Sequence, residues 1–467
     1  MSKVQVQIVR DDTHAVVTVT NTESASDDRL TQQPQIDLSF CQDVSGSMGG
    51  GCEVQTGGYA SRLDLCKHTL QFILRYLKGQ RVGLTSFDLA TYQVIPFQTV
   101  GEDLAGLTQK ISAMRPGSST NLSAGLQQSL LNLASATAGG DREAGRVRYL
   151  MVFTDGQANA GLTEEAKLLT LLQQHLAKIE GSVRVALFAF GEGCNHDLLQ
   201  RLAAGVDGVY YALTSAEDIP SAIGEVFGTA LETRQQNLEL LVAPEVMETM
   251  PGEKATFPDL LRGESRSRLF RLMDPGNFGT GHLTLRYLDC ETAETVTLPV
   301  SLATATSDPI LVSESTNVFR VAEATRKAAD LWGEARREIL QQCLDQVLAS
   351  ASAATDKTQL LVATLREQLE RGDLCPPSLL RQCSSNTRNF RGLGYASLGV
   401  ANFAAESQQA VSSSISQISG ETPALARASS APVGSLGMGL GRSQRNLVPR
   451  PTLVRASARE QRLNHLA

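Results

Sequence analysis

Three short segments carry oxygen-bearing side chains at points where apolar runs end. The first, SFCQDVSGSMGGGC, places Asp43, Ser45 and Ser47 at alternate positions. The second, RPGSSTNLSAGL, contains Thr120, and the third, YLMVFTDGQAN, contains Asp155. Hydroxyl and carboxylate oxygens are the ligands that hard divalent cations prefer. If the three segments converge, they form a site for Mg²⁺ (or Mn²⁺), whose small octahedral shell suits short hydroxyl side chains.

The surrounding pattern predicts the elements that would bring these side chains together. Between about 35 and 228, short β-branched or aromatic runs alternate with longer amphipathic ones. This alternation predicts an α/β fold with a doubly wound, mainly parallel sheet, which binds ligands at the carboxyl ends of its strands near a topological switch point. The expected strands are 36–42, 81–87, 92–99, 147–154, 183–190 and 209–213, and the expected helices are 61–77, 122–133, 163–179, 197–204 and 216–230.

The motifs DVSGSM, STNL and FTDGQ, in this order on a strand–helix background, resemble those of the von Willebrand factor A (VWA) family. The resemblance covers residues 35–230 and implies a Rossmann-like VWA domain. It also implies a complete metal-ion-dependent adhesion site (MIDAS). In the family, the hydroxyls bind the ion directly, the two aspartates alternate between direct and water-mediated contact, and an acidic side chain of a protein partner completes the coordination. The implied ligands are Asp43, Ser45, Ser47, Thr120 and Asp155.

The first motif and the glycine-rich insert after it each have another explanation. The segment from Asp43 to Ser47 alone could be a capped turn, because Asp, Ser and Gly favour turns for local reasons. The glycine-rich insert at 49–58 could be a phosphate-binding loop, but no Gly-Lys-Ser/Thr follows it and Lys67 lies inside an expected helix. We expect the insert to border the partner-binding surface, with a tolerated surface loop as the alternative.

Strand patterns flank this domain on both sides. Residues 1–30 and 237–304 contain segments such as VQVQIVR and HLTLRYL, which alternate apolar and polar residues at period two. Such segments are typical of antiparallel strands. We therefore expect the VWA domain to be inserted into one β-sandwich, in which the strands of 1–30 pair with those of 231–304. The arrangement is similar to that in proteins of the inter-alpha-inhibitor type.

The C-terminal part changes character twice. Residues 315–405 form an expected helical region, with a hairpin of helices over 319–351 and 358–371 and a break at 353–356. Residues 411–467 are rich in Ser, Ala, Gly and Arg, and their seven arginines and two glutamates give a net charge of +5. This composition predicts a disordered basic tail. Because it has no aromatic residue and no dense basic run, we do not expect nucleic acid as a partner.

Bulk composition narrows the class of protein. The chain has 467 residues, 42% of them hydrophobic and 19% charged, with a formal net charge of −7, which is ordinary for a soluble protein of several domains. It shows no apolar leader and no run approaching about 18 apolar residues, so we expect no transmembrane segment and a cytoplasmic location. The eight cysteines are scattered without a CxxC pair, which argues against structural zinc.

These observations predict an intracellular scaffold or adaptor that binds proteins through a divalent ion and is not an enzyme. A magnesium-dependent hydrolase is one alternative, but it needs a general base near the ion, and no His or Glu accompanies the five ligands in their motifs. An extracellular adhesion or channel-accessory protein is the other alternative, and it would require secretion.

Overall fold

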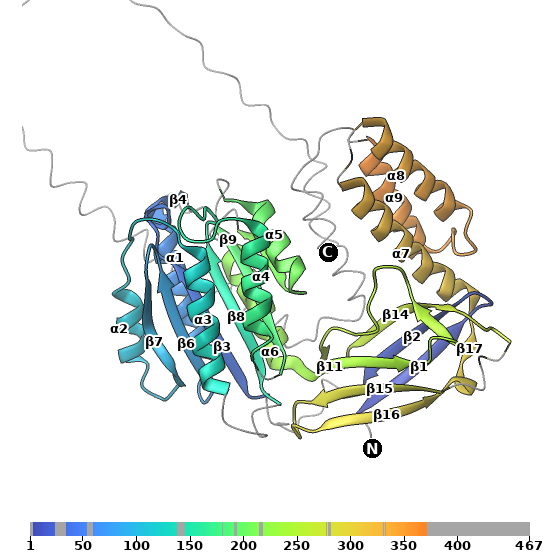
Figure 1. Ribbon diagram of the computed structural model, residues 1–467, viewed down its shortest axis with the longest axis horizontal. Coiled ribbons are helices and arrows are strands. Elements are labelled where there is room, and N and C mark those ends of the chain that lie inside the picture. The colour runs from blue at the N-terminus through green and yellow to red at the C-terminus, as the bar shows by residue number, and fades with distance from the viewer. Residues whose placement is uncertain are drawn as a thin grey trace, which may run out of the picture. The chain divides into compact units, whose positions relative to one another are not determined.

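The structure is a computed structural model (Figure 1). It describes residues 3–23, 34–53, 59–137, 145–179, 181–190, 194–213, 218–276, 278, 282–329, 331 and 333–370. Four predicted features lie partly or wholly outside these ranges: residues 24–30, the second half of the glycine-rich insert (54–58), the end of the helical region (371–405) and the basic tail (411–467). Within the described ranges, no helix is both long and apolar enough to cross a membrane.

A six-stranded sheet forms the centre of the first domain, and its strand order is β10-β9-β8-β3-β6-β7. All neighbours run parallel except β6 and β7, which form an antiparallel pair. Every residue of β3 and β8 is buried, as expected for strands covered on both faces. The six predicted strands are confirmed to within one residue at each end: β3 (Ile36–Asp43), β6 (Arg81–Phe87), β7 (Thr91–Thr99), β8 (Val147–Thr154), β9 (Val183–Phe190) and β10 (Val209–Leu213).

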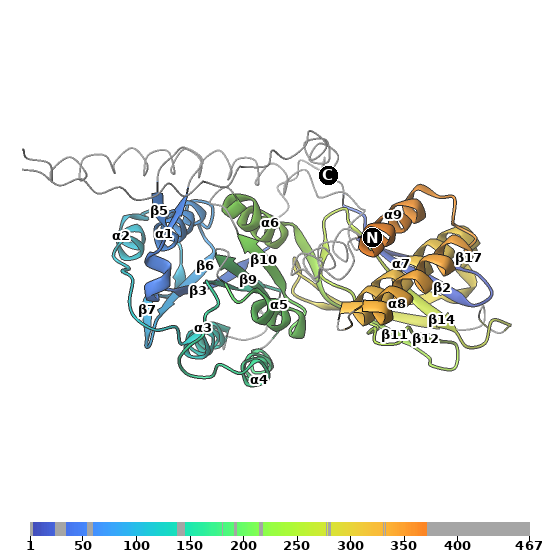
Figure 2. The ribbon, with the colours of Figure 1, turned by 90° about the horizontal axis from the view of Figure 1, so that it is seen from above.

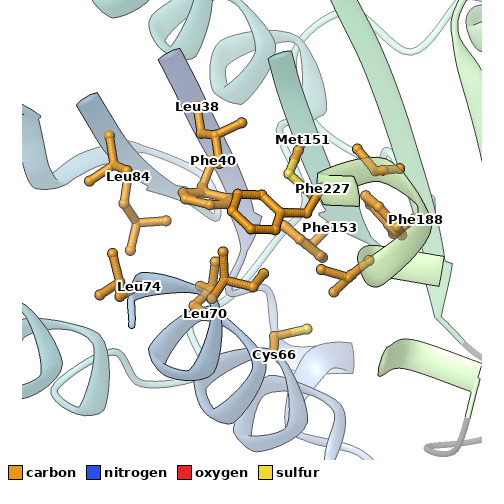
Figure 3. Packing of buried hydrophobic residues seen from close by; sticks show 14 of the residues in the cluster. Leu38, Phe40, Cys66, Leu70, Leu74, Leu84, Met151, Phe153, Phe188 and Phe227 are labelled. Atoms are coloured by element: carbon orange, nitrogen blue, oxygen red, sulfur yellow. The ribbon is translucent and has the colours of Figure 1, made fainter. Parts of the chain in front are cut away.

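Helices cover both faces of this sheet (Figure 2). One face packs against α1 (Arg62–Leu74), α2 (Ala105–Ser112) and α6 (Asp218–Glu232), and the other against α3 (Leu122–Thr137), α4 (Glu165–Leu176) and α5 (His196–Gly205). Figure 3 shows the first of these cores, in which Phe40 and Phe153 of the sheet meet Leu70 of α1 and Phe227 of α6. The sequence predicted five of the six helices and missed α2.

Strands from before and after this domain share one sheet, and later strands alone form a second sheet. One sheet has the order β12-β14-β2-β1-β17, and β2 pairs antiparallel with β14 so that Val17 lies opposite Arg268. A second sheet has the order β13-β11-β15-β16. Val17 and Ile8 of the first sheet share one buried cluster with Leu240 and Leu285 of the second. The bounds are β1 (Val4–Arg10), β2 (His14–Asn21), β11 (Thr233–Val242), β12 (Met247–Thr249), β13 (Leu260–Leu261), β14 (Ser265–Leu272), β15 (His282–Asp289), β16 (Thr295–Ser301) and β17 (Thr306–Ser307).

Deleting residues 1–22 is expected to cause aggregation. The deletion removes β1 and β2 from inside their sheet, takes Ile8 and Val17 from the shared core, and leaves β14 with an unpaired edge. Each lost buried side chain of this size contributes about 1.5–3 kcal/mol. Size-exclusion chromatography and thermal melting measure the effect, and deletion of 411–467 is the control. A truncated protein that stays monomeric and melts like the full chain would contradict the prediction.

Among the described residues, three helices follow the sheets: α7 (Pro309–Ala329), α8 (Gly333–Leu348) and α9 (Asp356–Glu370). The prediction of one continuous helix over 319–351 is wrong. Gly333 has a φ of +60°, in the left-handed region that glycine adopts at little cost, and a new helix begins there. Of the predicted break at 353–356, residues 353–355 lie between α8 and α9, and Asp356 begins α9. Val321, Leu344 and Leu361, one from each helix, share a buried cluster.

Candidate metal-binding site

The predicted ligands lie at the carboxyl ends of the two central strands. Asp43 is the last residue of β3, and Asp155 directly follows β8, the neighbour of β3. Along the chain, β3 is followed by β6 on one side and later by β8 on the other, so the direction of the sheet order reverses here. This is a topological switch point, where ligands bind in sheets of this kind. Both aspartates are almost completely buried, with 0% and 2% of their surface exposed.

The first loop brings Asp43, Ser45 and Ser47 together. The backbone N–H of Ser45 donates to Asp43 Oδ1 (2.8 Å), and Ser45 Oγ lies 3.1 Å from Ser47 Oγ. The other carboxylate oxygen, Asp43 Oδ2, accepts a hydrogen bond from Thr154 Oγ1 (2.6 Å). Ser45 is buried and Ser47 is exposed. The three side chains therefore form one cluster that faces solvent at Ser47.

The loop that carries Thr120 is joined by hydrogen bonds to the loops of both aspartates. The loop before α3 joins the first loop through Gly46 N–H, which donates to Ser118 O (2.9 Å). The loop after β8 reaches Thr120 through Asn159, whose Oδ1 accepts from Thr120 N–H (2.8 Å) and whose own N–H donates to Thr120 O (3.1 Å). Thr120 is 2% exposed. The second loop is thus fixed to both loops that carry the aspartates.

The two carboxylates influence each other electrostatically. Burial, with a smaller contribution from the negative charge of Asp155, raises the pKa of Asp43 to about 6. Hydrogen bonds from Ser45 and Thr154 favour the charged form and act in the opposite direction. The charged form of Asp43 is therefore disfavoured in this surrounding, and a bound cation would stabilise it.

The hydrogen bonding of the Asp155 carboxylate indicates whether a cation fits the site. Both of its carboxylate oxygens are buried and have no hydrogen-bond partner. Its ion pair with Arg62 is long, with 3.7 Å between Arg62 Nη1 and Asp155 Oδ2. A buried carboxylate so poorly compensated is costly unless a cation binds it. The site's two carboxylates and three hydroxyls are hard oxygen donors, which fit Mg²⁺ or Mn²⁺.

Metal sites built from His, Cys, Asp and Glu were sought in the described part of the chain as well. Within it, no three or more His, Cys, Asp and Glu side chains gather as they do around zinc. The cluster above contains only two such residues, because its other members are hydroxyls. The choice of a hard ion therefore depends on Ser45, Ser47 and Thr120 as much as on the aspartates.

Three residues at the site were not predicted. Thr154 was interpreted only as the end of its strand, yet its hydroxyl donates to Asp43 and accepts from Gly156 N–H (3.0 Å). Asn159 positions Thr120. Arg62 opens α1 and pairs with Asp155. Only Asn159 carried a sequence signal, as a polar residue four positions after Asp155 in the same loop.

Fold and site together define the class: a doubly wound α/β domain with a cluster of hydroxyls and carboxylates at its switch point. Residues 37–225 match the family model of the von Willebrand factor type A domain. This part of the chain, less than half of its length, is therefore assigned as a VWA domain.

Two solved structures resemble a larger part of the chain. The von Willebrand factor type A protein from Catenulispora acidiphila is 14% identical, with 77% of this chain and 89% of that chain covered and a TM-score of 0.52. The ArnB paralog VWA2 from Sulfolobus acidocaldarius is also 14% identical, with 83% and 98% covered and a TM-score of 0.56. No curated protein matches the chain in sequence. At this identity the likeness concerns the fold.

Proposed function

We propose that this protein binds other proteins through a divalent cation, Mg²⁺ or Mn²⁺, and acts as an intracellular scaffold or adaptor, not as an enzyme. The observation that carries the proposal is the buried carboxylate of Asp155, whose oxygens lack hydrogen-bond partners beside the buried Asp43. The residues that would hold the ion are Asp43, Ser45, Ser47, Thr120 and Asp155.

The burial of these residues suggests where a partner approaches. Asp43, Ser45, Thr120 and Asp155 are buried, whereas Ser47 is exposed. A ligand would therefore enter from the side of Ser47, at the carboxyl end of the sheet. A bound ion would supply an electrostatic anchor for an acidic side chain of the partner, since three of its five protein ligands are neutral.

Two exposed leucines, whose backbones are bonded to residues shortly after Thr120, fit a protein partner. Leu89 and Leu162 are 59% and 37% exposed. Asn121 Nδ2 donates to Leu89 O (3.4 Å), and Ser123 Oγ accepts from Leu162 N–H (3.0 Å). Both leucines are thus tied to the residues that follow Thr120. A partner segment with an acidic side chain and apolar neighbours would match this combination of charge and apolar surface.

Binding of displayed peptides tests the proposal. Full-length protein is incubated with a library of peptides that contain Asp or Glu flanked by apolar residues, in Mg²⁺ or in EDTA. We expect retention in Mg²⁺ alone, and loss when the acidic residue of a retained peptide becomes Asn or Gln. Thr120→Ala should lose retention and Thr120→Ser should keep it, because serine preserves the hydroxyl. Retention that EDTA and Thr120→Ala leave unchanged would contradict the proposal.

A further inference from the structure

A cationic side chain contacts the loops that carry the proposed metal ligands. Arg62 is the first residue of α1, and its Nη1 donates to Ser47 O (3.2 Å) while lying 3.7 Å from Asp155 Oδ2. Its backbone N–H donates to Gly50 O (3.1 Å), so both ends of the residue are fixed to the first loop. The side chain is 22% exposed. Arg62 therefore contacts the ligand cluster on one side and solvent on the other.

The position of Arg62 is unfavourable for its own helix. The amino end of a helix carries partial positive charge, so a cation in the first turn is repelled and an anion is stabilised. The helix follows this rule elsewhere, because Asp64 lies in the same turn and is bonded to the N-cap Ser61. Local helix physics does not explain an arginine here, which points to a role in the neighbouring loops.

The guanidinium of Arg62 does not use all of its hydrogen-bond donors. Its Nε is buried and has no hydrogen-bond partner, and the ion pair with Asp155 is longer than a hydrogen bond. The planar fork of an arginine can bind both oxygens of a carboxylate. Arg62 thus has donor capacity left for a further carboxylate.

We propose that Arg62 is a second cationic anchor for the partner's carboxylate, and that it opposes the metal ion while no partner is bound. This inference depends on the proposed metal-dependent function. In the metal-free protein Arg62 partly neutralises Asp155. A divalent ion at Asp155 repels the guanidinium, and a partner carboxylate that contacts both cations removes this repulsion. Metal and acidic ligand should therefore bind cooperatively, each strengthening the other.

Mn²⁺ titrations of the full-length protein, followed by the EPR signal of free Mn²⁺, test whether Arg62 opposes binding of the metal ion. A neighbouring charge at this distance shifts an equilibrium by about tenfold or more, so Arg62→Gln should bind Mn²⁺ about tenfold more tightly than wild type. Arg62→Lys should resemble wild type, because it keeps the charge. Arg75→Gln, at the far end of the same helix, is the control for net charge and should change little.

Addition of N-acetylglutamate amide as a carboxylate probe tests whether metal and carboxylate bind cooperatively through Arg62. In wild type the probe should tighten Mn²⁺ binding, and in Arg62→Gln it should do so several-fold less. Equal or weaker Mn²⁺ affinity in Arg62→Gln, or an undiminished effect of the probe, would overturn this inference and leave the proposed function standing. Absence of Mn²⁺ binding in wild type would instead overturn both. Melting in EDTA shows whether any variant has lost its fold.

Discussion

Replacing Asp155 with alanine is expected to weaken Mn²⁺ binding by about 100-fold or more, since even the loss of residues that only support metal ligands commonly costs 10- to 100-fold. The reason is that Asp155 offers two buried oxygens without hydrogen-bond partners, while Asp43 is already bonded to Ser45 and Thr154. Calorimetric titration of the full-length protein with Mn²⁺ or Mg²⁺ measures the loss.

Glu102→Ala is the matched control for this prediction. It also removes one carboxylate from the same domain, but Glu102 is highly exposed and follows β7, whose end lies beside the start of β6. That edge of the sheet is opposite to the one that carries the ligands, so Glu102→Ala should leave metal affinity unchanged. If both Asp43→Ala and Asp155→Ala keep the affinity of wild type, the five residues are not the metal site.

The strands of the VWA domain were predictable because burial on both faces leaves an unmistakable pattern. Met151 and Val152, neighbours on β8, pack into opposite cores, so the strand must be apolar throughout. The edge strand β7, which is largely exposed, and the helix α2 have weaker apolar patterns. α2 buries only Leu107 and Ile111 along eight residues, too few positions to establish a helical period.

The positions of the oxygen ligands were also predictable, because chain order and strand ends determine where Asp43, Thr120 and Asp155 lie. The contacts that orient them were not. Asn159 reaches Thr120 across 39 positions of sequence, and Arg62 reaches Asp155 across 93. Such pairs depend on how two loops fold against each other, which the local sequence around either residue does not determine.

A second large effect is expected at the other end of β3: replacing Asp37 with alanine should destabilise the protein by about 3–5 kcal/mol, the usual cost of removing one partner of a buried ion pair. Asp37 is fully buried. It accepts from Arg81 Nε (2.8 Å) and Nη2 (2.6 Å) and from Arg146 Nε (2.7 Å). Arg148 Nε lies 3.5 Å away. Without the carboxylate, three guanidinium groups would face one another in a poorly solvated place.

Urea unfolding measures this cost, and two variants calibrate it. Asp37→Asn keeps the shape and one acceptor oxygen but loses the charge, so it should be intermediate. Glu102→Ala breaks a pair with Lys78 in which both side chains are more than half exposed, and should cost no more than about 1 kcal/mol. Because Asp37 and Asp43 lie near opposite ends of β3, folded Asp37→Ala should still bind Mn²⁺ like wild type. A free energy of unfolding within about 1 kcal/mol of wild type would mean that the three arginines do not depend on Asp37 for their charge compensation.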